Sequence, residues 1–187
     1  MISEEVPPQR ADARRNRDRL LRAAAAAFGA GDEPALEAVA AEAGVGIGTL
    51  YRHFPSREAL VEAVYRSELH ALCEKAQDLL AAHEPSAALR QWMGNYADFV
   101  TTKRHMADTL RAVFTAGAIP SALTRNAVTG AVAAILAAGA EAKSLRADVD
   151  PDDVVTALLG VFLATDGPAD RARIDRLLDL LAAGLRA

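Results

Sequence analysis

Apolar residues recur every three to four positions along most of the chain, which is the period of an amphipathic α-helix. No segment of the sequence alternates apolar and polar residues with the period of two that favours a strand. Glycine and proline divide the helical pattern into separate pieces. The pattern therefore predicts an all-α protein, with helices over residues 12–30, 35–43, 47–54, 57–82, 85–103, 105–117, 121–145, 151–165 and 169–186.

The lengths of these helices predict the domain organisation. Three short helices come first, followed by one long helix over residues 57–82 and a larger group of helices. Ser56 is well placed to cap the long helix. We expect a disordered tail over residues 1–11, which are polar and rich in proline, an N-terminal domain over 12–56 and a larger domain over 57–187.

The composition also favours a helical protein and argues against a membrane location. Alanine is the commonest residue, and aromatic residues make up only 5% of the chain. A single cysteine excludes an internal disulfide and a zinc site with several cysteines. The N-terminal residues lack an apolar signal segment, and the longest uncharged stretch, Asn126–Ala140, is shorter than the roughly 18 residues that span a bilayer. We expect a soluble, cytoplasmic protein without a membrane partner.

Positive charge is concentrated near the N-terminus, although the net charge of the whole chain is −4. Six arginines and only two aspartates lie between residues 10 and 22, and the arginines include Arg14, Arg15 and Arg17. A basic segment on an acidic body suits contact with nucleic acid. The solvated face of an ordinary helix explains the same residues equally well.

Residues 35–54 have the spacing of a helix-turn-helix motif. The two short helices flank Gly44, which can take the left-handed backbone conformation that a sharp turn needs. Such a second helix fits the major groove of double-stranded DNA. A generic helical hairpin with a glycine turn has the same spacing. The exposed side of the second helix is expected to carry polar side chains, namely Thr49, Tyr51, Arg52 and His53.

Several segments together resemble the TetR family of transcriptional repressors. They are Leu20–Ala24 with Phe28, Val39–Ala40, Ala43–Val45 and the continuous run Gly48–Leu60. The resemblance implies three DNA-binding helices, a long fourth helix that acts as a lever, and a divergent helical body. It also implies a ligand-responsive transcriptional repressor that binds a palindromic DNA operator as a homodimer and is released by a small-molecule effector.

The resemblance further assigns contacts with the DNA backbone. Tyr51 and His53 match the phosphate-facing pair of the family, and Arg57 matches the basic residue at the start of the fourth helix, where phosphate is favoured. The chain departs from the family pattern at Gly46, where serine or threonine usually caps the recognition helix, and at Glu37, which would repel a phosphate. The N-terminal arginines are candidates to compensate.

The recognition helix also carries the candidates for base contacts. Arg52 can hold guanine with two hydrogen bonds, and Thr49 is a second base-contacting candidate. Gly48 allows the helix to approach the groove closely. Ile47 lies at the edge of the apolar side, so it either packs in the core or contacts a thymine methyl group or sugar.

The larger domain carries aromatic residues at helical spacing. Trp92, Tyr96 and Phe99 lie on one expected helix, and Phe114 lies on the next. Core packing explains most of such a stripe, but aromatic side chains with polar atoms also line apolar ligand pockets. These four are therefore candidate ligand-binding residues. The domain also resembles the SbtR-like subgroup of TetR effector domains, in residues 92–103 and 146–154.

No catalytic or cofactor-binding pattern is recognisable in the sequence. His70 and Cys73 lie one helical turn apart, but no third metal ligand stands near them, so packing explains them better than a metal or a redox role for the cysteine. We expect no enzyme activity, no cofactor and no metal. The alternative from another class is an all-α small-molecule carrier or enzyme without sequence-specific DNA binding. A structural DNA-binding protein without a ligand cavity is a third possibility.

The last two helices carry broad apolar stripes. These stripes are wider than terminal helices need to cover their own core, and two-fold pairing into a four-helix bundle would bury the excess. The resemblance implies the same pairing. The candidate dimer-interface residues are Leu158, Phe162, Leu177, Leu178 and Leu181.

Overall fold

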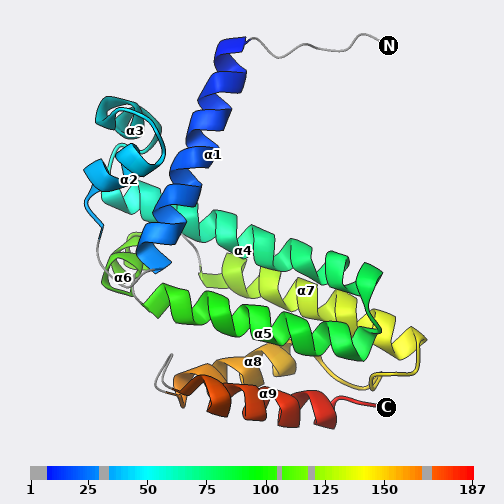
Figure 1. The fold of residues 1–187 in the computed structure, drawn as a ribbon. Coiled ribbons are helices and arrows are strands. Elements are labelled where there is room, and N and C mark those ends of the chain that lie inside the picture. Colours follow the sequence, from blue (N-terminus) through cyan, green and yellow to red (C-terminus); the bar gives the residue numbers. More distant parts are fainter. Residues whose placement is uncertain (1–7, 30–33, 105–106, 118–120, 166–169) are drawn as a thin grey trace, which may run out of the picture. The chain divides into compact units, whose positions relative to one another are not determined.

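The computed structural model describes residues 8–29, 34–104, 107–117, 121–165 and 170–187. Within these ranges the chain is helical apart from turns, and its one β-type pairing is an isolated bridge between Leu145 and Arg186 (Figure 1). The prediction of an all-α protein is therefore confirmed. The helices are α1 (Pro8–Gly29), α2 (Leu36–Glu42), α3 (Ile47–His53), α4 (Arg57–Ala82), α5 (Pro85–Arg104), α6 (Ala107–Thr115), α7 (Ser121–Glu141), α8 (Pro151–Leu163) and α9 (Arg171–Gly184).

Two helix ends differ clearly from the sequence expectation. Helix α1 begins at Pro8 and not at Asp12, so the last four residues of the expected disordered tail are helical. Proline is favoured in the first turn of a helix because its missing N–H has no helical partner there. The expected tail residues 1–7 lie outside the described residues.

Helix α7 ends at Glu141, four residues earlier than its apolar pattern predicts. The chain turns back at Lys143, which has a positive φ of 55°, and the backbone N–H of Leu145 then donates to the carbonyl oxygen of Gly139 at 3.1 Å. A Cβ atom on Gly139 would collide with the Leu145 side chain. The early end of α7 thus depends on a glycine that lets Leu145 fold over the helix.

The helices group into two compact units. Unit 1 comprises α1–α3, α4 up to Ser67, and α6, whereas unit 2 comprises α4 from Glu68 onwards, α5 and α7–α9. The sequence placed the boundary before α4 and assigned α6 to the larger domain. In the structure α6 belongs to unit 1, where the rings of Phe114 and Tyr65 meet edge to face at 5.5 Å.

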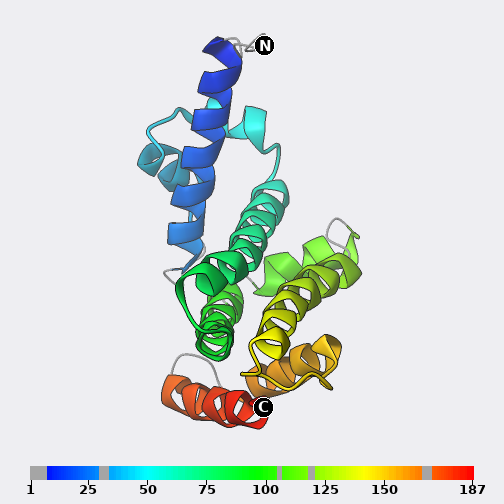
Figure 2. The same cartoon turned by 90° about the vertical axis from the view of Figure 1, so that its right-hand side faces the viewer.

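Unit 1 is built around α1, which packs against both short helices of the predicted motif (Figure 2). Leu20, Ala24 and Phe28 on α1 are buried. Val39 and Leu50 meet them from α2 and α3 and are also buried. Because each short helix has few residues to bury, this shared core and not helix propensity holds α2 and α3 in place.

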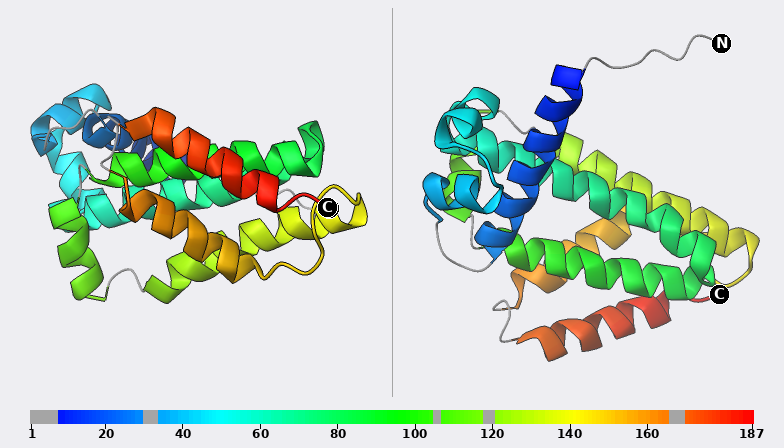
Figure 3. Two further views of the ribbon diagram at one scale, coloured as in Figure 1. Left: turned by 90° about the horizontal axis from the view of Figure 1, so that it is seen from below. Right: turned by 45° about the horizontal axis from the view of Figure 1, so that its top comes forward.

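Unit 2 is built around α5, which packs against α7, α8 and α9. Figure 3 shows α8 and α9, in orange and red, lying side by side against α5. Trp92 on α5 is fully buried and donates its indole N–H to the carbonyl oxygen of Leu72 at 3.0 Å. Asp150 caps α8 as its sequence position predicts, since its carboxylate accepts from the N–H of Asp152 at 2.8 Å.

Helix α7 supplies much of the apolar core of unit 2. Its segment Ala122–Glu141 is long and apolar enough, by length and composition, to cross a membrane. However, Val128, Val132 and Ile135 on this helix are buried, and α7 packs against α5 and α8. About 33% of this apolar stretch is thus buried in the core of unit 2.

Candidate nucleic-acid interface and ligand cavities

The turn between α2 and α3 has the backbone geometry that the sequence predicts. Gly44 has a φ of +65°, in the left-handed region, and the N–H of Val45 donates to the carbonyl oxygen of Ala40 at 3.0 Å. Ala40 is buried where α2 meets its neighbours. The two helices therefore pack closely and hold α3 in a fixed orientation in unit 1.

Helix α3 begins without a side-chain cap. Gly46 occupies the N-cap position, and no side chain accepts from the free N–H groups of the first turn. This confirms the absence of the hydroxyl cap that the sequence indicated. The space around Gly46 is open, so a larger residue would fit there.

Helix α3 has one buried and one exposed side. Leu50 is fully buried, whereas Ile47 is 36% exposed and Tyr51 is 47% exposed. Arg52 is also exposed, and Thr49 and His53 are half-buried. The structure thus resolves the ambiguity of Ile47, which lies at the surface. The predicted DNA-contacting residues of this helix are thus all at least partly accessible, and Gly48 has open space around it.

The guanidinium group of Arg52 lies along its own helix. Its Nε donates to the carbonyl oxygen of Gly48 at 3.1 Å, and its Nη2 donates to Oγ1 of Thr49 at 3.3 Å. These contacts join the two side chains that the sequence proposed as base-contacting residues. The remaining N–H groups of Arg52 stay available to an acceptor outside the chain.

Arg57 has a structural contact that the sequence did not predict. Its Nη2 donates to the carbonyl oxygen of Pro34 at 2.8 Å, and its Nη1 is buried without a hydrogen-bond partner among the described residues. Arg57 therefore ties the start of α4 to the segment before α2. This contact joins residues 23 positions apart, so no local pattern could have revealed it.

The N-terminus of α4 is capped beside Arg57. Oγ of Ser56 accepts from the N–H of Ala59 at 3.2 Å, as the sequence predicted. Hydrogen bonds from its own backbone N–H and from the Ser56 hydroxyl lower the pKa of the Glu58 carboxyl group. The start of α4 is therefore capped by its own side chains, Ser56 and Glu58.

The three candidate arginines on α1 are exposed, as a nucleic-acid contact requires. Arg14 and Arg15 project from the first half of the helix, and Arg15 pairs with Asp12. The guanidinium carbon of Arg17 lies 5.1 Å from the centre of the Phe54 ring. This cation–π contact links α1 to the end of the helix-turn-helix motif. No sequence pattern indicated the contact.

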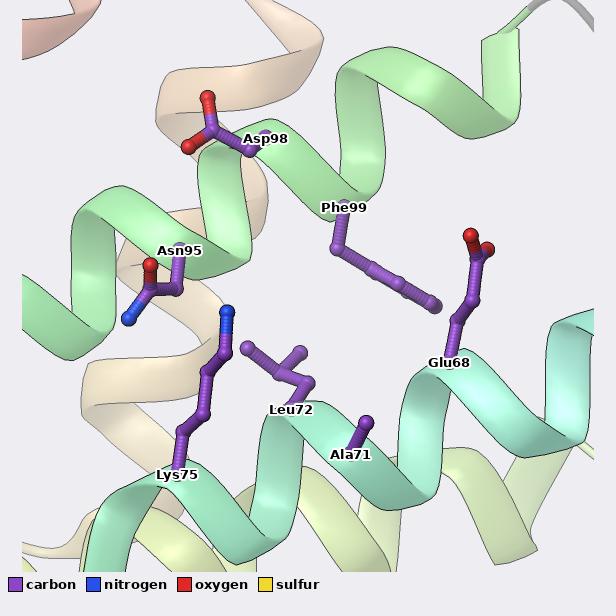
Figure 4. Close-up of a pocket in the computed structure, with 7 residues that line it drawn as sticks. All are labelled: Glu68, Ala71, Leu72, Lys75, Asn95, Asp98 and Phe99. Carbon is purple, nitrogen blue, oxygen red and sulfur yellow. The ribbon is translucent and has the colours of Figure 1, made fainter. Parts of the chain in front are cut away.

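Unit 2 contains a small cavity of about 240 Å³ between α4 and α5, called here the polar cavity (Figure 4). Phe99 extends from α5 toward Glu68 on α4, while Lys75 and Asn95 lie nearer the other end. Glu68 pairs with the ammonium group of Lys103. The full lining is Glu68, Ala71, Leu72, Lys75, Asn95, Asp98 and Phe99.

Lys103, the ion-pair partner of Glu68, is unusual because it is buried although charged. Its ammonium nitrogen lies 5.2 Å from the centre of the Phe99 ring and contacts Glu68. Burial lowers the pKa of Lys103 to about 8, while the carboxylate of Glu68 favours the charged form. No sequence pattern indicates this pair, because Glu68 lies on α4 and Lys103 lies on α5.

A second cavity, of about 480 Å³, lies between α5, α7 and α8 and is called here the apolar cavity. Val128, Val155 and Leu159 supply aliphatic walls, and the aromatic ring of Tyr96 closes one side. Arg125 contributes the one charged side chain to the lining. The remaining lining residues are Ala122 and Thr124.

The four predicted ligand-binding residues do not share one pocket. Tyr96 lines the apolar cavity and Phe99 lines the polar cavity, and their rings stack at 6.2 Å between centres. Trp92 is a core residue that lines neither cavity, with its ring 5.6 Å from that of Tyr96. Phe114 belongs to unit 1. A ligand-binding role of these four residues stays a prediction, and Tyr96 and Phe99 are the two that line cavities of unit 2.

The predicted dimer-interface residues differ in their exposure to solvent. Leu158, Phe162 and Leu178 are buried within unit 2, so they are not available at the surface of the chain. Leu177 and Leu181 are half-buried. The large apolar side chains left exposed on the last two helices are instead Leu163, at 87%, and Leu180, at 70%.

The two sequence candidates for a metal or redox role make ordinary contacts. His70 is exposed and its Nε2 lies 3.3 Å from Oε1 of Glu74. Cys73 is half-buried, its Sγ donates to the carbonyl oxygen of Ala127, and burial raises the pKa of its thiol. A raised pKa reduces the thiolate fraction and with it the reactivity of Cys73. The part of the chain with described side chains holds no group of three potential metal ligands.

Comparisons with known proteins match both parts of the chain. Residues 20–64 match the family of bacterial regulatory proteins of the tetR type, and residues 84–187 match the C-terminal domain of SbtR-like transcriptional regulators. No curated protein sequence matches the chain significantly.

Solved structures of regulators match over nearly the whole length. A TetR transcriptional regulator from Streptomyces coelicolor is 44% identical, with a TM-score of 0.81, over 91% of this chain and 98% of that chain. A TetR transcription regulatory protein from Mycobacterium vanbaalenii is 33% identical, with a TM-score of 0.72, over 96% of this chain and 100% of that chain.

Proposed function

Because the chain belongs to the TetR family of DNA-binding transcriptional regulators, we propose that it is a repressor that binds a palindromic operator as a homodimer. We further propose that a small-molecule effector releases it from DNA, and that it acts in the cytoplasm without enzyme activity. The observation that carries the proposal is the accessible polar face of α3 on a helix-turn-helix motif.

In this proposal α3 enters the major groove of the operator. Thr49 and Arg52 contact base edges, while Ile47 lies against a thymine methyl group or sugar. Tyr51, His53 and the start of α4 contact phosphates, and the N-terminal arginines supply further phosphate contacts. The bond from Arg57 to Pro34 leaves Arg57 to hold the motif together as well as to attract phosphate.

Dimerisation uses the outer face of α8 and α9. Leu163 and Leu180 are the most exposed large apolar side chains on these helices. Leu177 and Leu180 lie beside Arg173, Arg176 and Asp179 at a hollow of about 530 Å³ on α9. A second copy of this surface would cover the leucines and pair the charges at the rim.

The apolar cavity is the proposed effector site. Its volume and its mostly aliphatic lining suit a small organic molecule. Helix α4 is one continuous helix of 26 residues and contributes to both units, so it is the proposed path from the effector to α3. The effector shifts the equilibrium between the DNA-bound and released states only as far as it binds the released state more tightly.

Selection of DNA sites by the full chain from a random duplex library tests the proposal. We expect an inverted repeat whose half-site centres are separated by whole helical turns, roughly 34–36 Å or a multiple, and whose affinity falls steeply with salt. Sedimentation of the complex should show an even number of chains per duplex. Recovery of no preferred sequence would instead support the carrier or enzyme alternative.

A further inference from the structure

We propose that the apolar cavity selects an uncharged ligand that carries a carbonyl oxygen, and that the pair Arg125–Asp152 sets this preference. The inference rests on the proposed function, because it names the chemical class of the effector for the same cavity. It concerns ligand binding only and therefore does not require knowledge of the operator.

The walls of the cavity require an apolar body in the ligand. Val128 and Val155 are buried, and Leu159 and the ring of Tyr96 complete a surface with few polar atoms. A ligand that is polar throughout would lose its hydration without gaining hydrogen bonds from these side chains. The body of the ligand is therefore aliphatic or aromatic.

The polar part of the lining is gathered at one side, in the first turns of α7. Arg125 is the charged residue there, and Ala122 and Thr124 precede it on the same helix. The guanidinium group of Arg125 therefore calls for an acceptor atom on the ligand.

Asp152 already compensates the charge of Arg125. Nε of Arg125 donates to Oδ1 of Asp152 at 2.7 Å, and Nη2 donates to Oδ2 at 2.5 Å. Nη2 also donates to Oγ1 of Thr156 at 2.9 Å. These bonds use the Nε–Nη2 edge and leave Nη1 without a hydrogen-bond partner among the described side chains.

This arrangement distinguishes a neutral acceptor from an anion. A carboxylate beside Nη1 would be attracted by Arg125, but it would also be repelled by Asp152 and would lose its own hydration. A ketone, ester or amide oxygen accepts from Nη1 without this repulsion and loses far less hydration than a carboxylate. The cavity therefore favours a neutral carbonyl over a carboxylate on the same apolar body.

The test compares two probes of nearly equal shape, 4-phenylbutan-2-one and 3-phenylpropanoate. Binding of each to the full chain is followed by amide NMR spectra, which detect weak ligands. We expect the ketone to bind the wild type at least about tenfold more tightly than the carboxylate. Equal affinities, tighter binding of the carboxylate, or no binding of either probe at millimolar concentration would overturn the proposal.

Two substitutions test the roles of the pair separately. Arg125→Met removes the donor, so the affinity for the ketone should fall by about tenfold. Asp152→Asn removes the repelling charge and leaves Arg125 uncompensated, so the carboxylate should now bind at least as tightly as the ketone. Both side chains are partly exposed, at 43% and 47%, so neither variant should unfold the protein. An unchanged preference in both variants would overturn the assignment.

A matched control comes from the polar cavity. Lys75→Met also replaces a cationic side chain at a cavity of unit 2, but it should leave the probe preference unchanged. Selection of operator DNA is measured in parallel. If the protein selects an operator but shows no ketone preference, this inference fails while the proposed function stands. If it selects no DNA yet prefers the ketone, the proposed function fails instead.

Discussion

The exposed face of α3 and the cavities of unit 2 are assembled in different ways. On α3 buried Leu50 and exposed Tyr51 are neighbours in the sequence, so the seven residues of one short helix suffice to present the face. The apolar cavity needs side chains from α5, α7 and α8 together. A surface on one helix is fixed by local order along the chain, whereas a cavity depends on how several helices pack.

The same contrast exists inside α9, where Leu178 is fully buried and Leu180 is 70% exposed. Leu178→Asp would bury an unpaired carboxylate and leave a cavity, so it should lower the free energy of unfolding by about 4 kcal/mol. Leu180→Asp should change the unfolding free energy of the monomer by less than about 0.5 kcal/mol but should dissociate the dimer. Denaturant unfolding and sedimentation measure the two effects. A folded, dimeric Leu178→Asp variant would contradict the assignment of these positions.

The accessible face of α3 is tested by substitutions that leave the core intact. Arg52→Ala should weaken binding to the selected operator by about 1–3 kcal/mol and relax the preference at one base pair. Tyr51→Phe should weaken binding to all sequences alike, because a phosphate contact carries no base preference. Titration of variant proteins with operator and scrambled duplexes measures both. Wild-type binding by both variants would show that another surface contacts DNA.

The buried charge in unit 2 predicts a pH dependence that α3 does not share. Lys103 has a folded-state pKa of about 8, lowered from its ordinary value by burial. Between pH 8 and about 10 the unfolded chain therefore holds more protons on this residue, so the unfolding free energy should rise with pH, by about 1–2 kcal/mol. Lys103→Met should abolish this rise. The unfolding free energy is measured by urea unfolding at each pH. A wild-type value that does not change between pH 8 and about 10 would contradict the burial of a charged lysine.

The uncapped start of α3 gives the smallest expected effect. Gly46→Ser supplies the missing hydroxyl where the structure leaves open space, so it should raise the unfolding free energy of the protein by about 0.5–1 kcal/mol. Gly44→Ala is the matched control in the same turn, and it should be destabilising because its φ is +65°. Thermal unfolding compares the two. A destabilising Gly46→Ser would mean that the backbone there cannot serve as a cap.

The sizes of these expected effects follow from the difference between the exposed face of α3 and the packed interior of unit 2. A change in the packed core of unit 2 costs most because many side chains share it, and a change at the end of α3 costs least because it touches one hydrogen bond. The sequence predicted the burial of Leu50 and the exposure of Tyr51 and Arg52, because both follow from helical periodicity, but it left the place of Ile47 open. Trp92 and Leu178, whose patterns favoured a pocket and an interface, are fully buried in unit 2.

The chain by itself determined the all-α class, the glycine turn at Gly44, the Ser56 and Asp150 caps and the exposed side of α3, because each depends on neighbours within a few residues. The tertiary structure alone decided the bond from Arg57 to Pro34, the pairing of Lys103 with Glu68 and the clamp of Arg125 on Asp152. These contacts join residues 23 to 35 positions apart, or on separate helices. Helical periodicity specifies which side of a helix faces inward, but the side chain it meets there is fixed only when the helices pack.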